Sequence, residues 1–267
     1  MTLTHPAYEQ LRAVTPSASV LLADNPSQMT LQGTNTWILR APGSSEYVVI
    51  DPGPKDRKHS AAIARETGGK IALTLITHQH ADHTGGIDRL VALTGTPVRA
   101  VKSEFLRGDG TALVGGEVIE AAGIRLTVLA TPGHTEDSVS FLLDGPDDAA
   151  LLTGDTVLGS GTTVLESRDG ALADYLASLN NLIAVAPGRV LLPAHGPEHR
   201  DAEPVIRYYL AHREERLQQV RDALVKLGPN AKALQIVAMV YADVDKRLWP
   251  AARSSVQAQL AYIRSHG

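Results

Sequence analysis

The segment THQHADH at residues 77–83 constrains this chain more than any other feature. Three histidines and one aspartate fall within six positions, although the whole chain of 267 residues has only ten histidines. Imidazole and carboxylate groups at this density are typical of a site for zinc, manganese or iron. Because the segment directly follows the apolar run Ile71–Ile76, we expect it to leave the end of a β-strand.

The spacing within the segment predicts two neighbouring metal positions. In extended backbone, residues two apart point the same way, so His78 and His80 converge on one point. The chain then turns, and Asp82 and His83 face a second point nearby. Gly85-Gly86 permits a tight entry into the next helix.

Four other polar residues follow apolar runs in the same way. They are Asp51, His134, Asp155 and His195, each with Gly or Pro close by. A single His or Asp after a strand is usually a turn or cap residue. The repeated arrangement predicts one site held at rigid strand ends.

Runs of strand length and helical patterns share the first 200 residues, which predicts an α/β layered domain. The expected strands are Thr36–Leu39, Tyr47–Ile50, Ile71–Thr77, Val98–Val101, Arg125–Leu129, Val139–Leu143, Ala149–Leu152 and Arg189–Leu192. The expected helices are His59–Thr67, Gly86–Thr94 and Ala171–Val185.

The sequence changes in character near residue 203. One long amphipathic helix is expected over Val205–Leu227, ended by Gly228-Pro229, with two shorter helices around Leu234–Tyr241 and Arg253–Arg264. We therefore expect a catalytic domain over 1–203 and a C-terminal helical domain over 204–267. Residues 205–267 hold ten Lys/Arg and five Asp/Glu, a net charge of +5 in a chain of net charge −4. This favours an anionic substrate, although an ordinary solvated helix surface has the same composition.

Composition excludes several classes of protein. The chain has no cysteine, which rules out disulfides and thiolate metal ligands. No apolar run approaches the roughly 18–20 residues that span a bilayer, and no secretory signal is visible. We therefore expect a cytoplasmic protein with no membrane partner, and leave monomer and homodimer both open.

These motifs resemble the metallo-β-lactamase superfamily, in which HxHxDH is followed by three further ligands. The resemblance covers roughly residues 18–200 and implies an αβ/βα sandwich. It implies a first metal bound by His78, His80 and His134, a second bound by Asp82, His83 and His195, and Asp155 bridging the two. Asp51 is implied to support a ligating histidine from behind by a hydrogen bond. The expected cofactor is two Zn²⁺ per chain, with Mn²⁺ or Fe as alternatives.

Such a centre implies a hydrolase. Two cations ~3.5–4 Å apart share one bridging hydroxide, which attacks an electrophilic carbonyl carbon or phosphorus. The catalytic residues are expected to be Asp82 and Asp155, with a purely ligating role for Asp82 as the alternative. Antibiotic-cleaving members commonly have Cys or Ser at the position of Asp155, which argues against β-lactamase activity.

A closer resemblance, to the β-lactamase-like protein 2 group, rests on Asn25-Pro26, Met29–Trp37 and the tail residues Tyr209, His212-Arg213, Arg216 and Leu248–Ala252. It implies a small winged-helix-like C-terminal domain. The known animal member is a single-strand-selective endoribonuclease, and related fungal proteins are carrier-protein thioesterases.

The resemblance therefore implies a phosphodiesterase acting on single-stranded RNA. The alternative is a thioester hydrolase acting on a small molecule or an acyl carrier, as in glyoxalase II-like enzymes. A non-catalytic metal-binding interaction protein is the third class. Two further residues are candidates for substrate contact: Asn35, with a turn role as the alternative, and His199, with a surface role as the alternative.

Overall fold

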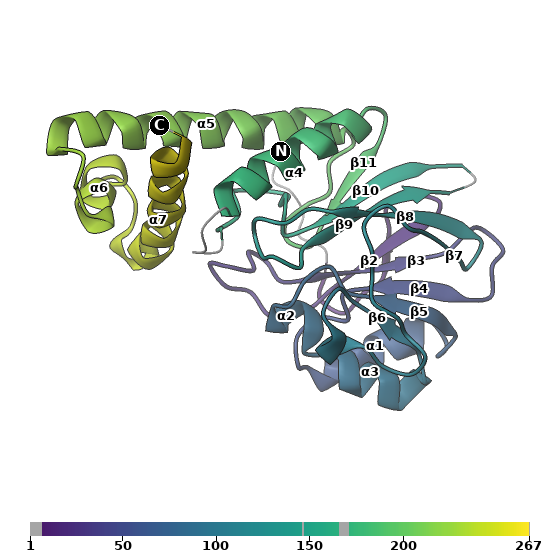
Figure 1. Ribbon diagram of the computed structural model, residues 1–267. Helices are drawn as coiled ribbons and strands as arrows, with labels where there is room; N and C mark the ends of the chain where they lie inside the picture. The colour runs from purple at the N-terminus through teal and green to yellow at the C-terminus, as the bar shows by residue number, and fades with distance from the viewer. Residues whose placement is uncertain (1–6, 146, 166–170, 267) are drawn as a thin grey trace.

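The computed structural model describes residues 7–145, 147–165 and 171–266. Two β-sheets stack face to face, and helices cover their outer faces (Figure 1). The first sheet has the order β1-β2-β3-β4-β5-β6. Its strands are β1 (Arg12–Ala13), β2 (Ala18–Leu22), β3 (Asn35–Leu39), β4 (Tyr47–Ile50), β5 (Ile71–Leu75) and β6 (Val98–Arg99). Strands β1 to β4 pair antiparallel, whereas β4, β5 and β6 pair parallel.

The second sheet has the order β11-β10-β9-β8-β7. Its strands are β7 (Val118–Ala121), β8 (Ile124–Ala130), β9 (Val139–Asp144), β10 (Ala149–Gly154) and β11 (Val190–Pro193). Only β10 and β11 pair parallel, and the other neighbours are antiparallel.

The main core lies between the two sheets. Side chains from both inner faces fill it, among them Leu39, Ile50, Leu75, Leu126, Phe141 and Leu152. Each such side chain, when fully buried, stabilises the fold by about 1.5–3 kcal/mol relative to an exposed one. The inner faces therefore hold the two strand frameworks rigidly against each other.

Helices cover the outer faces because the strands are apolar on both sides. Helices α1 (Arg57–Glu66) and α3 (Ile87–Thr94) pack on the first sheet, where Ile63 and Leu90 meet Ile38 and Val49. On the second sheet, α4 (Ala171–Val185) packs against β9, β10 and β11. This confirms the predicted αβ/βα sandwich. The shorter helices are α2 (Ala81–Thr84), η1 (Ser103–Phe105) and η2 (Lys246–Leu248).

The C-terminal region consists of α5 (Ala202–Leu227), α6 (Ala233–Val240) and α7 (Trp249–His266), and lies to one side of the sandwich (Figure 1). The first half of α5 shares a core with α4, and its second half packs on α6 and α7 in a separate core. One helix thus joins both cores. The boundary expected between residues 203 and 204 falls inside its first turn, so that division stays a prediction.

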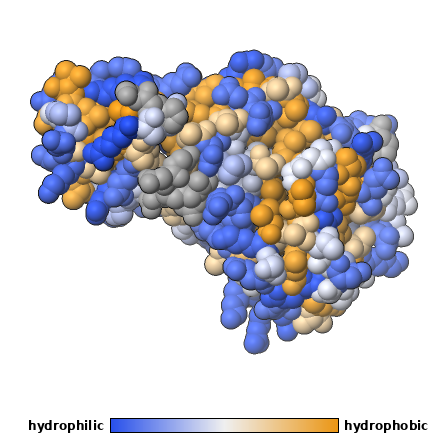
Figure 2. All heavy atoms as spheres, viewed as in Figure 1, coloured by the Kyte–Doolittle hydropathy of each residue, from blue (hydrophilic) through white to orange (hydrophobic). Residues whose placement is uncertain are grey.

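Figure 2 shows apolar residues in separate patches, each bordered by hydrophilic side chains. Among the described residues, no helix is both long and apolar enough to cross a bilayer.

Candidate metal centre

The predicted ligands meet at one edge of the sandwich. Each follows the carboxyl end of a strand: β5 precedes residues 77–83, and β8, β10 and β11 precede His134, Asp155 and His195. Two groups form there, each with possible ligand atoms within 4.8 Å of one another. The first group is His78, His80, His134 and Asp155, and the second is Asp82, His83 and His195.

In the first group, three imidazole nitrogens face one another. His80 Nδ1 lies 3.0 Å from His78 Nε2 and 3.0 Å from His134 Nε2. The Val164 carbonyl accepts a hydrogen bond from His134 Nδ1 at 2.7 Å, so Nε2 of a neutral His134 carries a lone pair. Burial lowers the pKa of His134 and holds that of His78 well below its usual value, so both rings are neutral. Neutral imidazole is the form in which histidine ligates a metal.

In the second group, hydrogen bonds on the side away from the site orient the two histidines. His83 donates from Nδ1 to Asp51 Oδ2 at 2.8 Å, and His195 donates from Nδ1 to the Gly33 carbonyl at 3.0 Å. Both rings are almost fully buried, at 0% and 1% exposure. These hydrogen bonds set the ring orientation and leave Nε2 of each histidine directed into the site.

Both Nε2 atoms face carboxylate oxygens. Asp82 Oδ2 lies 3.3 Å from that of His83 and 3.2 Å from that of His195. Asp155 Oδ1 lies 3.6 and 3.3 Å from the same two nitrogens. A lone pair facing a carboxylate is repulsive, so either a second proton on each ring or a metal cation must stand between them.

In the protein without metal, a second proton on the imidazole ring removes the repulsion between its lone pair and the carboxylates. Burial by itself lowers the pKa of His195, but Asp155 and Asp82 outweigh it and raise the pKa to about 9. Burial by itself raises the pKa of Asp155, yet His195 and His83 hold it well below its usual range. A metal ion that takes these ligands must therefore displace protons.

The residues fit a pair of divalent cations. Buried His83 Nε2 and Asp155 Oδ1 have no hydrogen-bond partner among the described residues, as expected of atoms meant for a ligand. Asp155 directs Oδ2 toward His134, at 3.5 Å, and Oδ1 toward the second group. Imidazole and carboxylate donors in these numbers suit zinc-type metals.

Asp51 holds the start of the motif. Its Oδ1 accepts a hydrogen bond from the Thr77 amide at 2.8 Å, and its Oδ2 accepts one from Thr77 Oγ1 at 2.7 Å in addition to that from His83. Its backbone lies in the left-handed region, with φ 53°. Such backbone costs about 1–3 kcal/mol for a non-glycine residue and persists only when the surroundings hold it. Here Thr36 Oγ1 also donates to the Asp51 carbonyl, at 2.5 Å.

Two glycines allow the strand ends to approach closely. A Cβ atom on Gly86 would lie 2.3 Å from the Pro52 carbonyl oxygen. One on Gly154 would lie 2.9 Å from the Thr77 side chain, and Gly154 has φ +51°. Larger residues at these positions would push the metal-binding loops apart.

The two expected substrate contacts have other partners. Asn35 is buried, and its Nδ2 donates to the carbonyls of Pro193 at 3.0 Å and Gly196 at 2.8 Å, which fixes the loop that carries His195. His199 donates from Nε2 to the Gly159 carbonyl at 2.7 Å. Neither lines the cavity described next, and their contact with substrate stays a prediction.

A cavity of about 320 Å³ opens beside His134 and Asp155. Its walls come from three places: the loop before β3, residues 158–164, and the C-terminal helices. Half of the wall residues are apolar or glycine: Met29, Leu31, Leu158, Gly161, Val164, Tyr241, Val244, Leu248, Ala251 and Ala252. Apart from Asp155, the charged wall residues are Arg213 and Arg216.

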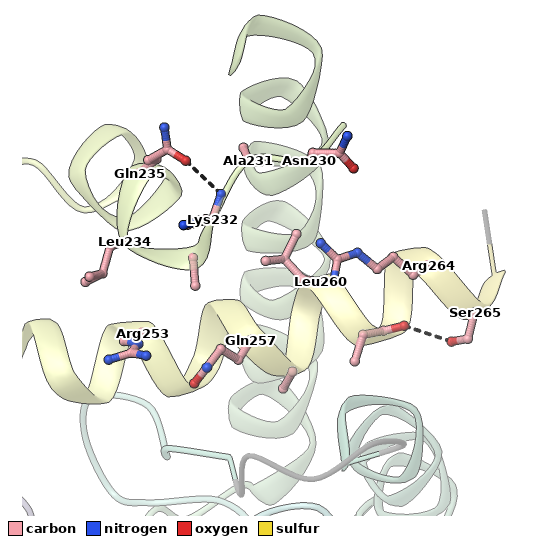
Figure 3. A pocket seen from close by; sticks show the side chains of 13 residues that line it. Asn230, Ala231, Lys232, Leu234, Gln235, Arg253, Gln257, Leu260, Arg264 and Ser265 are labelled. Carbon is pink, nitrogen blue, oxygen red and sulfur yellow. Dashed lines mark hydrogen bonds between the residues drawn. The ribbon is translucent and has the colours of Figure 1, made fainter. Parts of the chain in front are cut away.

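A larger cavity, of about 1080 Å³, lies within the C-terminal region (Figure 3). It is bordered by Lys232, Arg253 and Arg264, and shares no lining residue with the smaller one. It includes none of the candidate metal ligands, so the smaller cavity is the candidate substrate site.

Motif reasoning did not identify the residues that orient the ligands or form the walls. Gly33 and Val164 act through backbone carbonyls, which leave no trace in residue type. The tail residues His212, Arg213 and Arg216 stood out only as points of resemblance, and the structure places all three at the cavity.

Two stacked sheets with these ligands at their strand ends form the arrangement of a metal-dependent hydrolase. The profile of the metallo-beta-lactamase superfamily matches residues 29–195, and that of the beta-lactamase associated winged helix domain matches residues 233–264. The chain therefore belongs to the metallo-beta-lactamase superfamily. As a member it is an enzyme of the metal-dependent hydrolase class, and the fold implies a dinuclear metal site.

Relatives that are more than 30% identical to this chain carry two different kinds of name. A beta-lactamase-like protein 2 homolog of Drosophila melanogaster is 31% identical over 95% of this chain and 90% of its own length. An atrochrysone carboxyl ACP thioesterase of Aspergillus chevalieri is 35% identical over 82% of this chain and 69% of its own length. Among solved structures, a beta-lactamase domain protein from Burkholderia ambifaria has a TM-score of 0.83 at 20% identity, covering 99% of this chain and 90% of that one. That likeness supports the fold alone.

Proposed function

We propose that the protein hydrolyses thioesters of small acyl compounds at a two-zinc centre. In this proposal His78, His80 and His134 hold one cation, Asp82, His83 and His195 hold the other, and Asp155 lies between them. The observation that carries the choice of substrate is the largely apolar cavity of about 320 Å³ beside His134 and Asp155. A cavity of this size and lining accommodates a small acyl group.

Single-stranded RNA fits this cavity less well. Proteins that bind single strands combine a basic groove with aromatic side chains on which bases stack. Among the wall residues of the cavity, Tyr241 is the only Phe, Tyr or Trp. RNA remains the second candidate because residues 205–267 carry a net charge of +5. The thioesterase name of the Aspergillus chevalieri relative also supports the first candidate.

The residues can be assigned roles in this reaction. Divalent cations at such a site, when bound, make water nucleophilic at neutral pH and stabilise negative charge on a substrate oxygen. Burial by itself raises the pKa of Asp82, but His195 and His83 hold it far below its usual value. Asp82 is therefore ionised at neutral pH, which is the form in which a carboxylate ligates a cation. Hydrolysis breaks the bond between acyl carbon and sulfur and releases a carboxylic acid and a thiol.

The test is thiol release from neutral N-acetylcysteamine thioesters by zinc-loaded protein, with single-stranded RNA tested in parallel. The chain contains no cysteine, so a thiol reagent reports only the product. Release that disappears in Asp155→Ala supports the proposal. RNA cleavage that depends on Asp155, without thiol release, overturns it in favour of the nuclease. Failure on every substrate would favour the third class, a metal-binding interaction protein.

A further inference from the structure

Arg213 is a charged residue on an otherwise apolar helix face. It lies in the middle of α5, only 4% exposed, between the buried residues Tyr209 and Leu217. An arginine does not lose its proton in proteins, so this position is a permanent positive charge. Burying such a charge is costly unless an anion or several acceptors compensate it.

The protein compensates this charge only in part. The guanidinium donates a hydrogen bond to the Thr163 carbonyl and stacks over the Tyr175 ring, 5.2 Å from its centroid. No carboxylate forms an ion pair with it among the described residues, and its buried Nε has no hydrogen-bond partner there. By contrast, Arg12 and Arg189 form ion pairs with Glu198 and Asp144.

The uncompensated guanidinium lies at the candidate substrate site. Arg213 lines the same cavity as His134 and Asp155. Asp155 is the only acidic residue among the described residues of that wall, and its oxygens face the histidines of the two metal-binding groups. It is therefore committed to the metal centre and is not the counter-ion of Arg213.

A second arginine, Arg216, adds positive charge to this part of the wall. Arg216 also lines the cavity, with its guanidinium 4.8 Å from the Tyr241 ring centroid and a hydrogen bond to Gln219 at 2.9 Å. His212, from the same turn, also lines the cavity, but burial and the two arginines lower its pKa, so it adds no charge at neutral pH. Among the described residues, the cavity thus combines apolar walls with a basic region that has no free carboxylate beside it.

We propose that Arg213 binds a carboxylate carried on the acyl group, so that the preferred substrates are thioesters of dicarboxylic acids. This inference rests on the proposed thioester hydrolysis. The planar guanidinium matches a carboxylate in two-point hydrogen bonding, and such charge-assisted bonds strengthen away from water. The carboxylate supplies the missing counter-charge, and the aliphatic part of the acyl chain lies against the apolar walls.

A purely structural role for Arg213 must be separated from this one. Its hydrogen bond to the Thr163 carbonyl connects α5 to the segment whose Val164 carbonyl orients His134. Loss of Arg213 could therefore slow every substrate equally. Discrimination between charged and neutral substrates is the readout that a structural role does not change.

The experiment compares adipoyl-N-acetylcysteamine with its neutral amide, adipamoyl-N-acetylcysteamine. We expect the wild-type kcat/KM to favour the carboxylate by about 10- to 100-fold, the range typical of a buried hydrogen bond to a charged group. In Arg213→Met the ratio should fall to near 1, and in Arg213→Lys it should be intermediate. The control Arg253→Met removes an arginine of the larger cavity and should keep the wild-type ratio.

Several outcomes overturn the inference. A wild-type ratio near or below 1 does so, and so does an unchanged ratio in a folded Arg213→Met with normal zinc content. Should Arg213→Met fail to fold, Arg213→Lys and the wild-type ratio decide the question. The absence of thiol release from both compounds would instead overturn the proposed reaction.

A binding measurement then tests the subsite independently of turnover. Adipate should raise the Tm of the zinc-loaded wild type and of Arg253→Met more than that of Arg213→Met. Equal shifts in all three would mean that adipate binds elsewhere, for example at the metals, and would refute the Arg213 subsite.

Discussion

The metal-binding edge of the sandwich and the C-terminal helices contribute to the same cavity in different ways. The edge presents nitrogen and oxygen donors on strand ends, where two packed sheets and the hydrogen bonds of Asp51 hold them. The helices present wall residues from a separate core. In the proposed function, the edge supplies the chemistry and the helices supply substrate selection.

The largest effect is expected at the edge. Asp155→Ala removes the carboxylate whose two oxygens face the two metal groups. We expect kcat/KM to fall by about 10³-fold or more, because a bound metal supplies several kcal/mol of transition-state stabilisation. Zinc content measured by mass spectrometry should fall with it. The control Asp144→Ala, at the exposed end of β9, should retain both activity and zinc. Full activity in Asp155→Ala would contradict the proposed centre.

A smaller effect is expected at Asp51, which accepts a hydrogen bond from the candidate ligand His83. Asp51→Asn keeps a residue that tolerates left-handed backbone but weakens the support of His83. We expect zinc affinity to fall by about 10- to 100-fold, as for other residues that orient ligands. Competition with a chelator measures it. Asp56→Asn is the matched control, because Asn caps α1 as well as Asp does; an equal loss of affinity there would argue against a specific role for Asp51.

Substitutions in the part of the cavity wall formed by the C-terminal helices should alter substrate selection without reducing the zinc content. Ser255→Leu places a larger apolar group on the α7 side of the cavity. We expect KM for a hexanoyl thioester to rise about tenfold, a typical effect of changed pocket size, while acetyl turnover and zinc content stay near wild type. Gln257→Leu, on the same helix but in the other cavity, should leave both substrates unaffected. Equal losses for acetyl and hexanoyl substrates would mean that the wall does not select by length.

The smallest effect is expected at the surface, where Arg12 and Glu198 pair at 2.7 Å. The hydrogen bond from Arg12 lowers the pKa of Glu198, so the pair stabilises the fold above the unfolded-state pKa of Glu, about 4.3, and less as pH falls through the folded-state value. Glu198→Gln should cost about 0.2–1 kcal/mol at pH 7, as for other half-exposed pairs. The Tm difference from wild type should shrink at lower pH. A difference that grows on acidification would show that the sign of this linkage is wrong.

Much of the fold was predictable because apolar runs and turn residues are local signals. Strands such as Tyr47–Ile50 and the helix Ala171–Val185 agree with the predicted bounds. The sequence analysis missed three strands, β1, β2 and β7. Strand β1 has only two residues, too short to show a pattern, whereas length does not explain the other two, which have five and four residues. In the long amphipathic helix predicted over residues 205–227, residue type places Leu227 on the apolar face and Arg213 on the polar face, yet Leu227 is 38% exposed and Arg213 is buried. An amphipathic face is inferred from residue type, so a charged residue is assigned to the exposed face even when the fold buries it.

The amino-acid sequence by itself determined which side chains can ligate metals and that they follow strands, because alternation and turn residues act over a few positions. Tertiary structure alone decided how these side chains are oriented and what surrounds them. The Gly33 carbonyl orients His195 across 162 residues, and α5 brings Arg213 to a cavity formed mainly by other segments. Such contacts depend on how sheets and helices pack, and that information is spread over the whole core.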